Sequence, residues 1–192
     1  MRVSPALVSK STLEMQRALQ SSLEADWDRP AGGLDWSCRR TAAHVADDLF
    51  SYASQVLAQP LDGYLPVEVT VPDEASPEDL VRSVVMCGEL LRLTVASASE
   101  DVRAWHPYGT SDPEGFAAMG VVEVLVHTYD ITRGLGIDWA PPDDHCEPVL
   151  SRLFPDAPEG KPSDVLLWST GRVPLGDRPR LERWRWDSSV RG

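Results

Sequence analysis

Apolar residues recur at helical spacing in three stretches of the chain, and a fourth stretch is apolar almost throughout. The three stripes are Met15, Leu19, Leu23 and Trp27; Val45, Leu49, Tyr52 and Val56; and Leu80, Val84, Cys87, Leu91 and Val95. Each stripe gives one apolar face to an amphipathic helix. The fourth stretch, residues 120–126, is nearly all apolar apart from Glu123 and therefore predicts a helix that is buried on most sides.

Capping residues indicate where these helices begin and end. We expect the first helix over residues 11–28, because proline and glycine follow it. Ser37 is placed to cap the second helix, and Pro60 ends it. The third and fourth helices each begin with a capping residue followed by proline, at Ser76-Pro77 and at Asp112-Pro113. Four helices of this length are typical of an up-down bundle.

The remaining third of the chain is less regular. Short helices are expected over residues 143–154 and 163–170. The alternation in residues 181–186 is typical of a terminal strand, and the alternating valines of residues 67–71 predict another short strand. The sequence therefore predicts an all-α four-helix bundle over residues 1–140, with a short α/β appendage over residues 141–192 packed on it.

Charge and composition exclude several classes of partner. Eighteen basic and thirty acidic residues give a net charge of −12, which argues against a nucleic-acid surface and against docking on an anionic membrane. Three cysteines are too few for a disulfide framework, and no apolar run approaches the length of a membrane span. We expect a cytoplasmic protein that acts on a small molecule. A homodimer is one possible assembly.

Two residues of the apolar fourth helix carry the strongest chemical signal. Glu123 and His127 are four residues apart, so both side chains project from one face of the helix. Burying both is costly unless something satisfies them, and a divalent metal such as zinc would do so. His44, next to Val45 of the second stripe, is the candidate third ligand. A plain Glu–His hydrogen bond, with His44 an ordinary interhelical histidine, explains the same spacing.

Two aspartates accompany these candidates, and each has two interpretations. Asp130 follows His127 by three residues, so that it either orients the imidazole or forms a surface ion pair with Arg133. Asp48 lies one turn after His44, where it is either a general base near a metal or part of a solvated face.

The other histidines and cysteines have ordinary structural explanations. His106 lies in a loop, His145 and Cys146 lie near a helix start, and Cys38 lies in the first turn of the second helix. The chain contains no phosphate-binding glycine loop, no Gly-x-Ser-x-Gly elbow and no Cys-x-x-Cys pair, so nucleotide and serine-hydrolase chemistry have no support.

Three segments resemble a known family. Residues 34–45, with Trp36, Ser37 and His44, resemble the Trp-Ser/Thr…Ala-His signature that opens the second helix of the DinB-like superfamily. More narrowly, they resemble the N-terminal domain of mycothiol-dependent maleylpyruvate isomerases. Residues 123–130 resemble that group's second signature, Glu-x-x-x-His-x-x-Asp. The tail segments 166–172 and 179–186 resemble segments of actinobacterial members, whose composition also agrees with the sixteen Arg and two Lys of this chain.

The resemblance implies a DinB-like bundle with a divalent metal, usually zinc, at one end and with His44, Glu123 and His127 as its ligands. It also implies that the metal activates a low-molecular-weight thiol, mycothiol, for transfer to a small electrophile or for its isomerisation. We expect Arg40 and Arg172 to bind the thiol, and Arg172 to take part in catalysis together with Asp48.

The sequence also departs from the family pattern. Only about 50 residues follow the bundle, where the isomerase proper carries a larger C-terminal domain, and Tyr129 stands where many relatives have Trp. The expected activity is therefore thiol S-transfer or a related isomerisation rather than maleylpyruvate isomerisation itself. Two alternatives stay open: a metal-dependent hydrolase with Asp48 as base, and a non-catalytic bundle that binds a small molecule or a protein and keeps a vestigial metal site.

Overall fold

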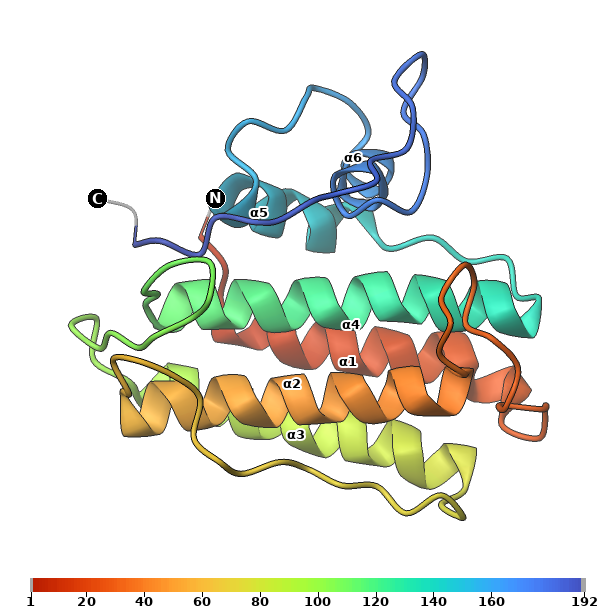
Figure 1. Ribbon diagram of the computed structural model, residues 1–192, viewed down its shortest axis with the longest axis horizontal. Coiled ribbons are helices and arrows are strands. Elements are labelled where there is room, and N and C mark those ends of the chain that lie inside the picture. Colours follow the sequence, from red (N-terminus) through yellow and green to blue (C-terminus); the bar gives the residue numbers. More distant parts are fainter. Residues whose placement is uncertain (1, 191–192) are drawn as a thin grey trace.

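The computed structural model describes residues 2–190, and in that range every regular element is helical (Figure 1). The helices are α1 (Pro5–Leu19), α2 (Cys38–Ala58), α3 (Pro77–Ser97), α4 (Pro113–Leu135), α5 (Asp143–Leu153) and α6 (Pro162–Ser169). A single 3₁₀ turn, Gln20–Ser22, follows α1. The predicted all-α bundle is confirmed, since α1 to α4 form its four helices.

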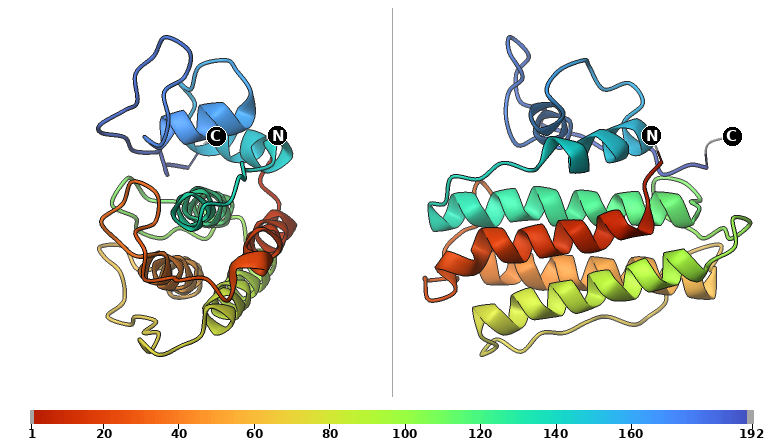
Figure 2. Two further views of the ribbon diagram at one scale, coloured as in Figure 1. Left: turned by 90° about the vertical axis from the view of Figure 1, so that its right-hand side faces the viewer. Right: turned by 180° about the vertical axis from the view of Figure 1, so that it is seen from behind.

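The bundle places α1 and α2 at opposite corners. Each of them packs against both α3 and α4 (Figure 2). The helices do not simply alternate in direction: α2 and α3 run the same way, because the connection of residues 59–76 returns along the whole bundle before α3 begins (Figure 1). A helix of 21 residues is about 32 Å long, and an extended chain of this size spans that distance easily.

The predicted caps of the second, third and fourth helices are confirmed. The side chains of Ser37, Ser76 and Asp112 accept hydrogen bonds from backbone N–H groups in the first turns of α2, α3 and α4. Each bond satisfies a donor that the helix itself leaves free. Gly136 ends α4 in the left-handed conformation that favours glycine, with φ of 73°.

The first helix lies elsewhere than the expected residues 11–28. It begins at Pro5 and ends at Leu19, and two side-chain hydrogen bonds hold the 3₁₀ turn and the loop that follow it. The hydroxyl of Ser22 donates to the carbonyl of Leu19 at 2.9 Å, and the indole N–H of Trp27 donates to the carbonyl of Ser22, also at 2.9 Å. Trp27 is fully buried in a loop, so the apolar stripe continued past the end of the helix.

Neither predicted strand forms in the described residues, and the expected α/β character of the appendage is therefore wrong. Residues 67–71 are extended without a partner strand, and the N–H of Val69 donates instead to the carboxylate of Asp47 at 2.7 Å. Residues 181–186 are irregular, and Trp186 packs on the rings of His106 and Tyr108 rather than on a sheet.

The appendage consists of α5, α6 and an irregular C-terminal segment, and it lies over α4 (Figure 1). Two backbone groups fasten the segment: Ser111 donates through its hydroxyl to the carbonyl of Ser188 at 2.7 Å, and the N–H of Asp187 donates to the carbonyl of Leu153 at 2.9 Å. The division into two units at residues 140 and 141 stays a prediction. Among residues 2–190, no helix has the length and apolarity that a membrane crossing requires.

Gly120 allows α4 to lie close to its neighbours. A β-carbon at this position would lie 2.6 Å from Leu91 of α3 and 3.0 Å from Leu49 of α2. Both side chains are completely buried and have little room to move. The absence of a side chain at Gly120 therefore sets the spacing between α2 and α4, the two helices that carry the candidate ligands.

Candidate metal centre

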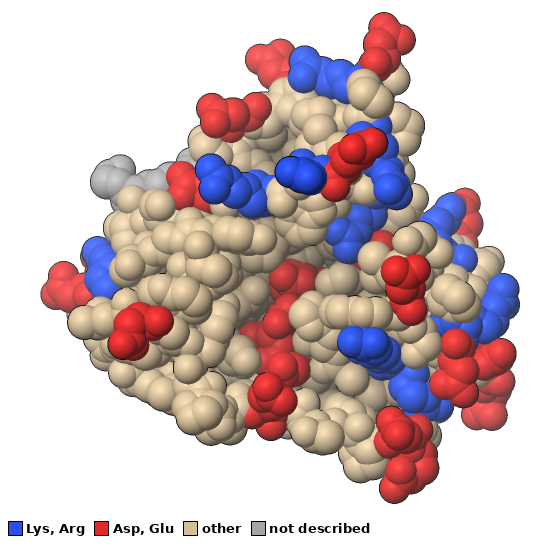
Figure 3. All heavy atoms as spheres, in the orientation of Figure 1, with Lys and Arg blue, Asp and Glu red and all other residues tan. Residues whose placement is uncertain are grey.

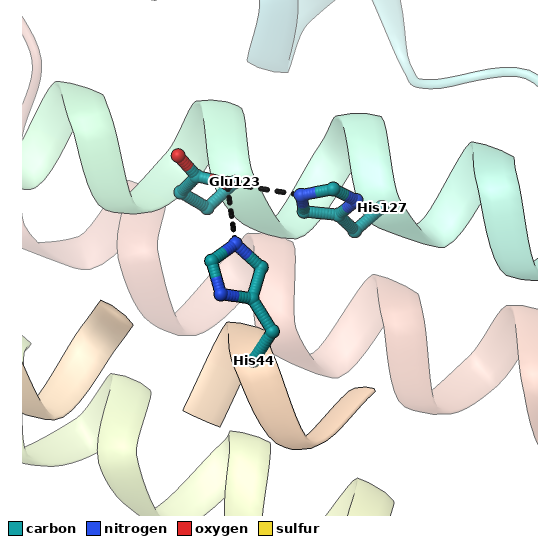
Figure 4. A group of neighbouring side chains, drawn as sticks. All are labelled: His44, Glu123 and His127. Atoms are coloured by element: carbon teal, nitrogen blue, oxygen red, sulfur yellow. Dashed lines mark ion pairs between the residues drawn. The ribbon is translucent and has the colours of Figure 1, made fainter. Parts of the chain in front are cut away.

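Three side chains from two helices meet between α2 and α4 (Figure 4). His44 comes from α2, and Glu123 and His127 come from α4, one turn apart. One ligand atom from each lies within 4.8 Å of the other two, and no other group of three such side chains in residues 2–190 does so. Oε2 of Glu123 lies 3.2 Å from Nε2 of His127 and 4.0 Å from Nε2 of His44.

This donor set fits a zinc ion. Zinc in proteins takes imidazole nitrogen and carboxylate oxygen at about 2.0–2.2 Å, so ligand atoms of a four-coordinate ion lie roughly 3.3–3.6 Å apart. The Glu123–His127 separation is already close to this range, and a small rotation of His44 would bring its nitrogen into it. Three protein ligands leave a fourth position open, which is the arrangement of catalytic rather than structural zinc sites.

The three side chains lie along the side of the bundle. The family resemblance predicts a different position for the metal, at one end of the bundle. Glu123 and His127 are near the middle of α4. Figure 3, in the orientation of Figure 1, shows a hollow in the middle of this face, with acidic atoms on its floor and basic atoms above it. The side chain of His44 is 31% exposed, against 9% for His127. The group is therefore buried on the α4 side and accessible on the α2 side.

Asp130 orients His127. Its Oδ2 lies 3.0 Å from Nδ1 of His127, and Arg172 binds the same carboxylate through two nitrogens, at 2.8 and 3.2 Å. Of the two interpretations of Asp130, the surface pair is wrong, because Arg133 pairs with Asp138 instead. A carboxylate on the second nitrogen of a histidine ligand is a recurring feature of metal sites, since it fixes the tautomer and the ring orientation.

The surrounding charges reverse the effect of burial on three pKa values. Burial alone lowers the pKa of His127, but hydrogen bonds to Asp130 and Glu123 outweigh it and raise that pKa to about 9. Burial raises the pKa of Glu123 and of Asp130, yet the adjacent imidazole, with Arg172, brings both below their usual values. Without metal, the side chains of His127, Glu123, Asp130 and Arg172 therefore form a network of charged groups. In this network Nε2 of His127 carries a proton at the position where it would otherwise bind the metal.

Asp48 belongs to the same group and not to a solvated face. Its Oδ2 lies 3.1 Å from Nε2 of His44, and it shares a hydrogen bond with Glu123. Burial, followed by the nearby charge of Glu123, raises the pKa of Asp48 well above its usual value. The sequence placed Tyr52 in the apolar stripe, but its hydroxyl also forms a hydrogen bond with Glu123. Nothing in the spacing of Tyr52 distinguishes it from a core residue.

The two candidate arginines lie in different positions. Arg172 is buried beside the site, where Asp130 and the carbonyl of Thr170 occupy its guanidinium group. Arg40 stacks over the ring of Trp36, 4.6 Å from its centroid, and Trp36 in turn meets the ring of His44 edge-on. Arg172 therefore positions Asp130, whereas Arg40 lies close to the exposed side of His44.

The other chemically versatile residues lie outside this group. His145 bonds to Ser11 on the opposite side of α4, with Nδ1 3.2 Å from the hydroxyl. The three thiols are buried, and burial raises the pKa of Cys38 and of Cys87 to about 11 and that of Cys146 further. None of the cysteines is a reactive thiolate at neutral pH.

A comparison with protein families assigns the chain. The profile described as "Mycothiol maleylpyruvate isomerase N-terminal domain" matches residues 8–132, which include His44, Glu123, His127 and Asp130 but not Arg172. Searches of curated proteins and of solved structures gave no match. The matched region covers about two thirds of the sequence and contains all three candidate ligands. The chain therefore belongs to the mycothiol maleylpyruvate isomerase N-terminal domain family.

Proposed function

We propose that the chain is an enzyme that holds a divalent metal, preferably zinc, and uses mycothiol to modify a small electrophile. The observation that carries this proposal is the meeting of His44, Glu123 and His127, of which His44 is partly exposed, in a chain that belongs to a mycothiol-related family. Two imidazoles and one carboxylate form the ligand set expected for a metal that also binds an outside molecule.

The chain's own residues prepare this site. Asp130 fixes the ring of His127, and Arg172 fixes Asp130, so that the ligand is held before any metal arrives. Asp48 is the group that we place as the acceptor of the thiol proton, because its carboxyl oxygen lies 3.1 Å from His44. The metal would supply one effect, a lower pKa for a thiol at the open position, which yields a nucleophilic thiolate at neutral pH.

The reaction requires no oxidant or reductant. In transfer, the sulfur forms a bond to carbon, the bond to the leaving group breaks with its electron pair, and the proton taken from the thiol neutralises that group. In isomerisation, the same carbon–sulfur bond forms and then breaks after rotation. Arg40 is our candidate for binding an anionic part of either reactant, since it has no carboxylate partner among residues 2–190 and lies beside Trp36 near His44.

The test is a thiol-consumption assay with zinc-loaded protein, mycothiol and a panel of electrophiles, in which mass spectrometry identifies the conjugate. We expect a rate above the uncatalysed background, lost in His44→Ala and reduced in Arg172→Ala. His145→Gln, which changes a histidine outside the site, should keep the rate.

Two results would contradict the proposal. One is the absence of turnover with full metal occupancy, combined with no heat of mycothiol binding by isothermal titration. The other is turnover of esters or amides without mycothiol, which would instead support a metal-dependent hydrolase with Asp48 as base.

A further inference from the structure

A second cavity, with a volume of about 870 Å³, lies in the C-terminal part of the chain. It is open to solvent, and the connection between α5 and α6, helix α6 and the C-terminal segment line most of it. Nearly all of its lining is outside the residues 8–132 that the family profile matches. Trp168, Trp184 and Trp186 are part of its wall, and we call it the tryptophan cavity. Its size is that of ordinary small-molecule sites.

The aromatic walls give the cavity flat apolar surfaces. The ring centroids of Trp184 and Trp186 lie 5.7 Å apart, and those of Tyr108 and Trp186 are also separated by 5.7 Å. Trp184 is 36% exposed, which is unusual for a large ring that the chain could have buried. The guanidinium group of Arg172 lies over this ring, 5.5 Å from its centroid, and the part of the indole that stays exposed offers a platform for the apolar side of a ligand ring.

Two buried polar atoms on the same wall have no partner. The indole N–H of Trp186 and the hydroxyl of Ser169 form no hydrogen bond within the described chain, although each residue is only 6% exposed. A buried polar group without a partner costs about 1–3 kcal/mol, and such groups are uncommon in folded proteins. By contrast, the N–H of Trp168 donates to the carbonyl of Pro179 at 3.0 Å. Both atoms are shielded from solvent, so a ligand with suitable acceptors and donors would remove the cost at Trp186 and Ser169 once a small movement of the wall admits it.

The charged residues of the lining restrict the class of ligand. Arg183 and Arg185 form no ion pair within residues 2–190, and Asp156 and Asp187 contribute carboxylates to the same wall. An apolar ligand would cover all four charges, an anion would face the two carboxylates, and a cation would face the two guanidinium groups. Hydroxyl groups both donate and accept, so they suit a wall of mixed sign.

We propose that the tryptophan cavity binds a polyhydroxylated ring, a sugar or a cyclitol. The apolar face of the ring packs on Trp184, and its hydroxyl groups satisfy Trp186, Ser169 and the charged side chains around them. None of the three candidate metal ligands lines the cavity. The two regions meet at Arg172, whose guanidinium group lies over the ring of Trp184, 5.5 Å from its centroid, and also binds Asp130. The test of the proposal is therefore made without metal and without thiol, so that its outcome is distinguishable from that of the thiol chemistry.

The experiment uses the full chain without metal and measures binding by ligand-observed NMR and isothermal titration. The probes are D-glucose for the sugars and myo-inositol for the cyclitols, with benzoate and inorganic phosphate as an aromatic anion and a simple anion. We expect saturable binding of at least one polyol, and the two polyol arms tell which kind of ring is preferred. Benzoate and phosphate should not compete.

Matched tryptophan variants locate the binding. Trp184→Ala should weaken polyol binding about tenfold through loss of the stacking face. Trp186→Phe keeps a ring but removes the N–H, and should weaken binding roughly threefold. Trp139→Phe is the control with unchanged affinity, because Trp139 lies outside the cavity and bonds to Glu14. Circular dichroism should be the same in all four proteins.

Three results would overturn the proposal. The first is no saturable binding of either polyol. The second is binding of benzoate or phosphate in preference to both polyols, which would indicate an anion site. The third is wild-type affinity in folded Trp184→Ala and Trp186→Phe, which would place the polyol elsewhere on the chain.

Discussion

Buried polar groups are paired in the candidate metal centre and left unpaired in the tryptophan cavity. His127 lies between two carboxylates, and Arg172 completes the network on Asp130. In the cavity, Trp186 and Ser169 are buried to a similar degree but have no hydrogen-bond partner. Paired groups hold one another in a fixed geometry, which suits ligands that must meet a metal, whereas unpaired groups remain available to an incoming molecule.

The largest expected effect comes from breaking the network of the metal centre. Asp130→Ala would leave the buried Arg172 without its carboxylate and His127 without its orienting partner. We expect a loss of about 3–5 kcal/mol in the free energy of unfolding, measured in urea. Asp138→Ala is the matched control, because its pair with Arg133, at 3.0 Å against 2.8 Å for Arg172 and Asp130, lies on the surface, and it should unfold like the wild type. Equal stability of the two variants would contradict the pairing described above.

The second largest effect on stability concerns His106, which lies between α2 and the wall of the tryptophan cavity. Its ring packs near Tyr52 on one side and Trp186 on the other. Burial lowers the pKa of His106 from 6.5 to about 4. At a pH between 4 and 6.5, His106 binds a proton in the unfolded chain but not in the folded chain. The contribution of the neutral ring to the free energy of unfolding is therefore complete above pH 6.5 and is lost as the pH falls toward 4.

The measurement is the free energy of unfolding of wild type and of His106→Gln at pH 7 and at pH 4. The stability of the wild type relative to the variant should fall by roughly 1–3 kcal/mol across this interval. Parallel pH profiles of the two proteins would show that His106 is not buried in its neutral form.

The smallest effect compares two buried tryptophans directly. The N–H of Trp27, in the bundle, donates to the carbonyl of Ser22, whereas the N–H of Trp186, in the cavity, has no partner. Replacement by Phe removes ring volume in both cases but a hydrogen bond only at Trp27. Trp27→Phe should therefore lower the free energy of unfolding by about 1 kcal/mol more than Trp186→Phe. A greater loss at Trp186 would mean that its N–H is satisfied, and would remove one support of the polyol proposal.

Local signals account for most of what the sequence predicted. A cap acts within one turn, so Ser37, Ser76 and Asp112 marked the starts of α2, α3 and α4 correctly. The proximity of Glu123 and His127 follows from helical spacing alone, and it too was predictable. His44 could be assigned as the third ligand only by knowing which helix packs against α4. Periodicity does not determine this packing, and the family resemblance indicated it.

The features that were missed depend on contacts between distant parts of the chain. Asp130 has Arg133 within reach on its own helix, but it pairs with Arg172, 42 residues away. Trp27 continues the apolar stripe of α1, yet it packs from a loop, because a core accepts an apolar ring from any backbone. The alternation in residues 181–186 is that of a strand, but within residues 2–190 no other segment pairs with it. In each case tertiary packing, and not the local sequence, determines the partner or the conformation.

The most direct test of the metal centre is an isothermal titration of metal-free protein with Zn²⁺, at neutral pH and at constant salt. We predict one ion per chain in the wild type and in His145→Gln, and loss of that binding in His44→Ala and in His127→Ala, with helical content by circular dichroism retained because the apolar core does not depend on the ion. No saturable binding in the wild type, or undiminished binding in His44→Ala and His127→Ala, would contradict the assignment of these residues as metal ligands.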